Sequence, residues 1–72
     1  MFMDLDVGHI PLTAERAKSI MAEYIFKGWK LKYREVEEED DDGPGSTFYY
    51  FENGRDGARA IVIYTDGTAY LD

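Results

Sequence analysis

The apolar and polar residues of this 72-residue chain follow a helical period first and an alternating period afterwards. The residues on the helical period are Ala17, Ile20, Met21, Tyr24 and Ile25. Spacings of three and four place them on one face of an α-helix. Thr13 is a residue type that caps helix N-termini, and Gly28 is the type that commonly follows a helix end. The pattern therefore predicts a helix over residues 14–27.

From residue 29 onwards, apolar residues occur mostly at every second position, which is the period of a β-strand. Strands are predicted at residues 29–36, 47–52, 58–65 and 68–71, separated by turn-forming segments. Residues 1–11 also alternate and favour a short edge strand or an arm. The predicted fold is α+β, with one N-terminal helix on one face of an antiparallel meander of three to four strands, in a single small domain of residues 1–72.

The predicted loops indicate which residues lie opposite one another. Residues 53–57 form one loop, and Asp66-Gly67 is a two-residue hairpin signal. The predicted opposite pairs are Thr65 with Thr68, Ile63 with Tyr70, Val62 with Leu71, Phe51 with Arg59, Tyr49 with Ile61, Phe48 with Val62, and Arg34 with Tyr49.

These pairs divide the sheet into two faces. The face assigned to the helix holds Leu31, Tyr33, Phe48, Tyr50, Ala60, Val62, Tyr64 and Leu71. The second face holds Lys30, Lys32, Arg34, Tyr49, Phe51, Arg59, Ile61, Ile63 and Tyr70. Because one helix covers one face, the second would expose more apolar surface than a small monomer usually does. Its cover is expected to be residues 1–11, a second copy or a protein partner, unless a one-residue slip exchanges the two faces.

Within the second face, six residues form the candidate surface for a partner or a dimer. They are Tyr49, Phe51, Arg59, Ile61, Ile63 and Tyr70. Aromatic side chains such as tyrosine often supply a large share of the binding free energy at protein interfaces when they are buried there.

Seven carboxylates occur within residues 35–42. They are Glu35, Glu37, Glu38, Glu39, Asp40, Asp41 and Asp42. Adjacent like charges repel, so residues 37–46 are expected to form a solvated acidic loop containing Gly and Pro. The spacing does not fit a calcium loop, because Tyr49 stands where the bidentate carboxylate is needed. The run is a candidate surface for a basic protein partner.

The charge and composition narrow the function classes. A formal net charge of −7 opposes direct nucleic-acid binding and binding to anionic membranes. The chain has no cysteine, which removes disulfides and CxxC metal sites. It has no apolar stretch of about 18 residues and no signal-peptide pattern at its start, so a cytoplasmic location is expected.

The sequence contains no recognisable catalytic set. His9 is the single histidine, Ser19 lies in the predicted helix, and Ser46 is a predicted turn residue. A solvated acidic loop lacks the burial that adjusts carboxylate pKa values for acid–base chemistry. No enzyme activity, cofactor or metal site is expected.

Two short segments resemble the PepSY family, in which a helix is followed by a strand meander. The first is the L-T-A-E-R-A run at residues 12–17, and the second is Tyr64-Thr65-Asp66-Gly67. The resemblance implies the same order of helix and strands. PepSY modules are usually exported or linked to membranes, and this chain shows no export signal.

The sequence predicts a non-catalytic, small, acidic protein-binding module that inhibits or regulates a basic or nucleic-acid-binding protein. A more specific version of this hypothesis is a nucleic-acid mimic of the phage-encoded inhibitor kind, in which the carboxylates of residues 35–42 take the place of phosphates. The alternative is a homodimeric structural or assembly protein that pairs through the aromatic sheet face.

Overall fold

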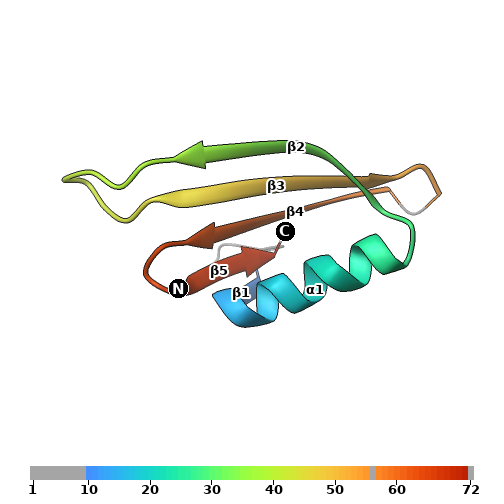
Figure 1. The fold of residues 1–72 in the computed structure, drawn as a ribbon, viewed down its shortest axis with the longest axis horizontal. Coiled ribbons are helices and arrows are strands. Elements are labelled where there is room, and N and C mark those ends of the chain that lie inside the picture. Colours follow the sequence, from blue (N-terminus) through green and yellow to red (C-terminus); the bar gives the residue numbers. More distant parts are fainter. Residues whose placement is uncertain (1–9, 56, 72) are drawn as a thin grey trace, which may run out of the picture.

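The computed structural model describes residues 10–55 and 57–71, which form an α+β fold of one helix and a five-stranded antiparallel sheet (Figure 1). The elements are β1 (Ile10–Thr13), α1 (Ala14–Phe26), β2 (Lys30–Glu37), β3 (Ser46–Asn53), β4 (Gly57–Tyr64) and β5 (Thr68–Leu71). The strand order across the sheet is β1-β5-β4-β3-β2. Consecutive strands from β2 to β5 are neighbours, which confirms the predicted meander.

Helix α1 begins where its sequence predicts and ends one residue before the predicted end. The backbone N–H of Arg16 donates a 3.1 Å hydrogen bond to Oγ1 of Thr13, the N-cap. At the other end, Lys27 is the C-cap, one residue earlier than predicted, and Gly28 has a φ of 97°. Glycine adopts that left-handed conformation without the penalty that a Cβ imposes. The turn at Gly28 directs the chain into β2.

The sheet has one strand more than predicted, because Ile10–Thr13 pairs with β5. The predicted N-terminal strand or arm overlaps it at Ile10 and Pro11, and its remaining residues lie outside the described part of the chain. The backbone N–H of Ala14 donates a 2.9 Å hydrogen bond to the carbonyl of Gly67. This bond holds the start of α1 against the β4–β5 turn.

Strand pairing confirms most of the predicted registers. Tyr49 lies opposite Ile61, and Arg34 lies opposite Tyr49, as predicted. The other pairs predicted between β3 and β4 are also observed. The β4–β5 register is wrong by one residue, because Val62 lies opposite Tyr70 and not Leu71. The backbone N–H of Gly67, at φ 94°, donates a 3.1 Å hydrogen bond to the carbonyl of Tyr64. Three residues therefore form this loop instead of two, a common hairpin geometry with a left-handed glycine.

The core lies on the sheet face opposite to the one assigned from the sequence. Ile61 is 0% exposed and Phe51 is 1% exposed. Ile61 packs with Ala17 of α1 and Ala69 of β5, and partly buried residues surround this cluster. The surrounding residues are Leu12, Ile20, Met21, Tyr24, Ile63 and Leu71. The assignment was wrong although the β3–β4 register was right, because alternation separates two faces without saying which one a helix covers.

A β-bulge between Leu31 and Tyr33 shifts the register at the start of β2. Leu31 lies opposite Phe51 on the helix side of the sheet, whereas Tyr33 lies opposite Tyr50 on the other side. The predicted grouping of these two residues on one face is therefore wrong. The bulge also separates the basic residues of β2, since Lys30 lies opposite Glu52 and Arg34 opposite Tyr49.

Residues 10–55 and 57–71 contain one helix, α1. It is neither long enough nor apolar enough to cross a membrane.

Candidate functional site

The sheet face turned away from α1, here called the open face, is rich in aromatic side chains. It carries Tyr33, Phe48, Tyr50, Ala60, Val62, Tyr64 and Tyr70, all placed there by the strand registers and the alternation of side chains. Two ring pairs pack edge to face, with centroid distances of 6.2 Å for Tyr33 and Phe48 and 6.1 Å for Tyr64 and Tyr70. None of the elements in residues 10–55 and 57–71 packs over these rings.

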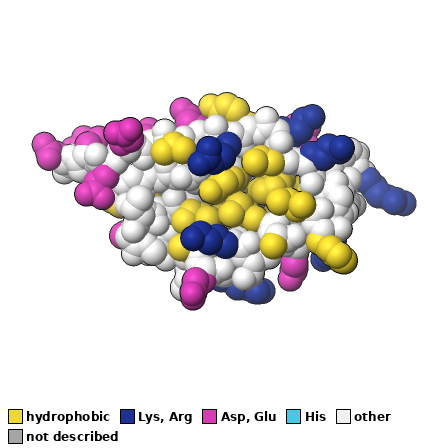
Figure 2. Space-filling model, viewed as in Figure 1, with side chains coloured by type: hydrophobic (Ala, Val, Ile, Leu, Met, Phe, Trp, Pro, Cys, Tyr) yellow, Lys and Arg dark blue, Asp and Glu magenta, His cyan; other side chains and the backbone are white. Residues whose placement is uncertain are grey.

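The acidic run extends the β2–β3 hairpin beyond the sheet and ends in a tight turn. Asp40 and Gly43 exchange backbone hydrogen bonds of 3.1 and 3.2 Å, leaving Asp41 and Asp42 at the tip. The backbone N–H of Asp42 also donates a 2.8 Å hydrogen bond to Oδ1 of Asp40. All seven carboxylate residues are exposed. Acidic side chains consequently gather at one end of the molecule, where β2 and β3 are joined (Figures 1 and 2).

The return segment of this hairpin is fixed by a close approach at Gly45. This glycine is buried, and a Cβ built on it would lie 2.9 Å from the carbonyl oxygen of Glu37 and 2.9 Å from the backbone nitrogen of Glu39. The carbonyl of Gly45 accepts a 2.9 Å hydrogen bond from the backbone N–H of Thr65. The base of the acidic hairpin is therefore held beside the end of β4, next to Tyr64.

Two adjoining hollows lie where the acidic hairpin meets the open face. One, of about 350 Å³, is lined by Glu35, Glu37, Ser46, Phe48, Val62 and Tyr64. The other, of about 330 Å³, is lined by Glu37, Glu38, Asp40, Asp42, Gly43, Pro44 and Tyr64. Because Glu37 and Tyr64 line both, we treat the two hollows as one acidic–aromatic groove. Its lining includes carboxylates, which accept charge-assisted hydrogen bonds, and aromatic rings, which attract cations.

One carboxylate of the groove is hydrogen-bonded to the open face. The hydroxyl of Tyr33 donates a 3.0 Å hydrogen bond to Oε1 of Glu35, two residues along β2. This hydrogen bond and the negative charge of Glu35 raise the pKa of Tyr33 above its ordinary value of 10.0. The other perturbed group lies in the β4–β5 turn, where the hydroxyl and N–H of Thr68 donate to Oδ1 of Asp66 and lower its pKa.

The structure brings together only part of the predicted acidic surface. Glu35, Glu37, Glu38, Asp40 and Asp42 line the acidic–aromatic groove, whereas Glu39 and Asp41 belong to the same hairpin but line neither hollow.

The predicted aromatic surface is divided between several environments. Phe51 and Ile61 are buried beneath α1, and Ile63 packs against the same core. Arg59 lies over the ring of Trp29, with its Cζ atom 5.8 Å from the ring centroid. Tyr70 lies on the open face, on the other side of the sheet from the first three. These residues do not form one exposed surface.

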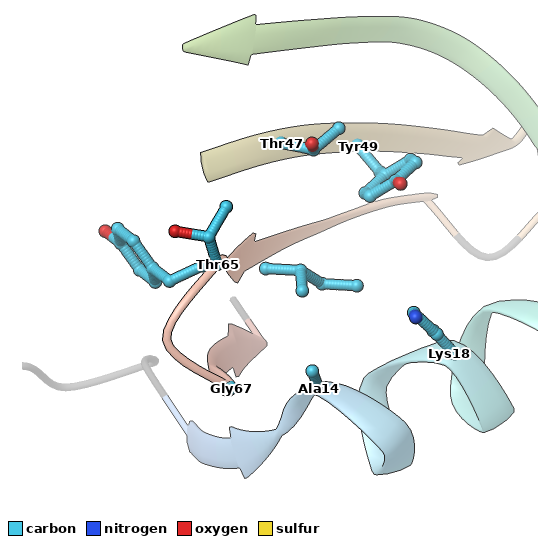
Figure 3. Close-up of a pocket in the computed structure, with 8 residues that line it drawn as sticks. Ala14, Lys18, Thr47, Tyr49, Thr65 and Gly67 are labelled. Atoms are coloured by element: carbon cyan, nitrogen blue, oxygen red, sulfur yellow. The ribbon is translucent and has the colours of Figure 1, made fainter. Parts of the chain in front are cut away.

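The sixth of these residues, Tyr49, lines another hollow on the helix side of the sheet, which shares Tyr64 with the acidic–aromatic groove (Figure 3). This hollow, of about 360 Å³, is lined by Ala14, Lys18, Thr47, Tyr49, Ile63, Tyr64, Thr65 and Gly67. Lys18 is the charged residue of that lining, and the others offer hydroxyl, backbone and apolar groups. Nothing in this set pairs a nucleophile with a base, so its chemistry is that of a shallow contact surface.

Apart from Tyr70, which was predicted to be exposed, the open-face aromatics were missed as surface residues because they were assigned to the face beneath the helix. A signal for the correct assignment was present. Tyr33, Tyr50 and Tyr64 carry hydroxyls that keep access to water on an uncovered face. Ile61 and Ile63 carry no polar atom and suit the covered face.

Within residues 10–55 and 57–71, no group of three or more His, Asp or Glu side chains is arranged to hold a metal ion. Comparison with protein families, curated proteins and solved structures finds no match to this chain.

Proposed function

We propose that this protein is a non-catalytic binding module that recognises a basic segment of another protein in the acidic–aromatic groove. The observation that carries the proposal is that Glu37 and Tyr64 line both hollows of the groove. A Lys or Arg side chain placed there meets carboxylates and an aromatic side chain together. Such a combination is selective for cations because each part attracts positive charge.

The charge distribution supports a basic partner. The acidic hairpin lies at one end of the molecule, and the Lys and Arg side chains lie away from it, over the middle of the visible face and at the other end (Figure 2). An acidic projection of this kind steers a basic surface towards the groove, and rings beside it add apolar contact area. Basic segments with this chemistry are common in nucleic-acid-binding proteins. In the proposed function the protein therefore inhibits or regulates such a protein in the cytoplasm by occupying its phosphate-binding surface.

The experiment measures binding of a Lys- and Arg-rich peptide by isothermal titration calorimetry, at low and high salt. Affinity should fall as salt rises, because the attraction between exposed charges is screened. An acidic peptide of equal length and a bare oligonucleotide should not bind. Binding of the basic peptide that does not respond to salt would contradict the proposal.

Two double variants separate the groove from the overall charge. Glu37→Gln with Asp42→Asn removes two carboxylates that line the groove, and Glu39→Gln with Asp41→Asn removes two from the same hairpin that do not. The net charge changes equally in both. The first should weaken binding by about tenfold or more, equivalent to about 1.4 kcal/mol, and the second by much less. Equal losses would show that the hairpin acts only as a diffuse negative charge.

A further inference from the structure

Strand β2 forms a free edge of the sheet. It stands last in the strand order, and all eight of its residues are exposed (Figure 1). Three of them are large apolar or aromatic side chains: Leu31 is 45% exposed, Tyr33 51% and Val36 56%. A long edge strand with such residues presents unpaired N–H and C=O groups to any strand that can reach it.

We propose that the β2 edge pairs antiparallel with β2 of a second copy, joining two five-stranded sheets into one across a two-fold axis at Arg34. The sequence of β2, K-L-K-Y-R-E-V-E, is basic in its first half and acidic in its second. An antiparallel copy of the same strand reverses that order. Each basic half therefore faces an acidic half, as a two-fold interface requires.

The β-bulge sets the register of this pairing. Across an antiparallel pair, opposite side chains must point to the same face of the sheet. Lys32 has no partner in β3, so Lys32 and Tyr33 together occupy one position, opposite Tyr50. With the axis at Arg34, Lys30 lies opposite Glu37 of the second copy, and Leu31 lies opposite its Val36. The position shared by Lys32 and Tyr33 lies opposite Glu35 of the second copy. Every pair then shares a face.

The faces follow from the observed pairing with β3. Lys30 lies opposite Glu52, and Glu37 lies opposite Ser46, both on the open face. Leu31 and Val36 lie opposite Phe51 and Thr47, both on the helix side. Without the bulge, Lys30 and Glu37 would point to opposite faces, because they stand an odd number of residues apart. The irregularity in β2 is what makes the strand complementary to itself.

The other sheet edge is a poorer surface for pairing. Strand β1 has four residues, and one of them is Pro11, which has no backbone N–H to donate. An additional strand would gain few hydrogen bonds there. The complementary charges and the exposed apolar residues both lie on β2.

The pairing also includes one unfavourable contact. Arg34 lies on the axis and faces Arg34 of the second copy, and like charges placed directly opposite each other are destabilising. Arg34→Thr should therefore strengthen the dimer, although the variant makes each copy more acidic. A weaker dimer would show that the axis does not pass through this residue.

The decisive test uses charge reversal and sedimentation equilibrium at concentrations up to a few hundred micromolar. The wild-type chain, of 8.3 kDa, should associate to a dimer. Lys30→Glu alone and Glu37→Lys alone each set like charges opposite one another at two symmetric positions. Each should weaken the dimer by about tenfold or more. An equimolar mixture of the two variants should recover dimers, because the carboxylate introduced in one chain then faces the ammonium group introduced in the other.

Matched controls use the same charge changes on α1. Lys18→Glu and Glu23→Lys alter exposed helix residues and should leave the dimer unchanged. A strictly monomeric wild-type chain, or variants whose mixture does not associate, would overturn the proposal. In a sample mixing isotope-labelled and unlabelled chains, intermolecular nuclear Overhauser effects should connect Leu31 with Val36. Contacts of Tyr50, Tyr64 or Tyr70 with the second copy, without those between Leu31 and Val36, would identify a different interface and also overturn it.

The dimer can be tested separately from the proposed function, since the sedimentation test contains no peptide. A failure of peptide binding would leave the dimer result unaffected, and a monomeric chain could still bind the peptide.

Discussion

The hydroxyl of Tyr33 lies 3.0 Å from Oε1 of Glu35 and donates a hydrogen bond to it along the open face of β2. Ionisation of Tyr33 would break this bond and place a second negative charge beside Glu35. The pKa of Tyr33 is consequently raised above 10.0. A raised pKa in the folded protein contributes stability below the ordinary tyrosine pKa, and that stability is lost as pH rises through the folded value.

Replacing Glu35 by Gln should lower the pKa of Tyr33 towards its ordinary value, because the amide carries no charge. The measurement is an NMR titration of the Tyr33 ring resonances in alkaline solution. Glu52→Gln is the control, since Glu52 is an exposed carboxylate of β3 that does not contribute to the raised pKa of Tyr33. A Tyr33 midpoint that is the same in the wild type and in Glu35→Gln would contradict the contact.

Ile61 and Val62 are adjacent in β4 but point to opposite faces, and only Ile61 is covered by α1. Ile61→Ala should reduce the free energy of unfolding by about 3 kcal/mol, because it leaves a cavity in the core. Val62→Ala, on the open face, should cost clearly less. Urea denaturation monitored by circular dichroism measures both. Should Ile61→Ala fail to fold, Ile61→Val should still cost about 1 kcal/mol. A larger loss for Val62→Ala would mean that the helix covers the other face.

The faces on which Ile61 and Val62 lie also show which features of the fold could be predicted from the sequence and which could not. The cap at Thr13, the end of the helix before Gly28 and the β3–β4 register depend on local chemistry, and all were predicted correctly. Which face α1 covers depends on where the helix starts relative to the sheet. That position is set by the pairing of β1 with β5 and by the Ala14–Gly67 hydrogen bond, both of which join distant parts of the chain.

The candidate site was predictable to a similar extent. The exposure of the acidic run follows from its repelling charges and was expected. The contact between that run and Tyr64 was not, because it depends on the hydrogen bond from Thr65 to Gly45. The bulge at Lys32 likewise has no glycine or proline to indicate it, and it arises from how β2 fits against β3.

Gly45→Ala should distort the base of the acidic hairpin. The added methyl would meet backbone atoms of Glu37 and Glu39 at 2.9 Å, and backbone cannot move aside as a side chain can. We expect a loss of about 1–3 kcal/mol in the free energy of unfolding, typical of overpacking. Gly54→Ala is the matched control, because its methyl would meet nothing within 4 Å. Thermal unfolding of both variants checks the prediction, and equal stabilities would show that the close approach at Gly45 is relieved at little cost.

The proposed peptide site and the proposed dimer edge share Glu35 and Glu37. In the dimer these carboxylates face lysines of the second copy, whereas in the peptide complex they face the basic segment. The two events should therefore oppose each other, so that saturating Lys- and Arg-rich peptide converts dimers to monomers. By thermodynamic linkage, strengthening the dimer with Arg34→Thr should weaken the apparent affinity for the peptide by a corresponding factor.

Sedimentation with increasing peptide concentration measures this opposition directly. The Glu39→Gln, Asp41→Asn variant keeps Glu35 and Glu37, so peptide should dissociate its dimer as it does the wild type. A Glu38→Gln, Asp42→Asn variant loses two groove carboxylates that lie beyond the paired strand, so much higher peptide concentrations should be required to dissociate its dimer. A peptide that binds the wild-type dimer without dissociating it would show that the groove and the edge use different groups. In that case Glu38, Asp40 and Asp42 would hold the peptide, because these groove residues lie beyond the end of β2 and outside the proposed strand pairing.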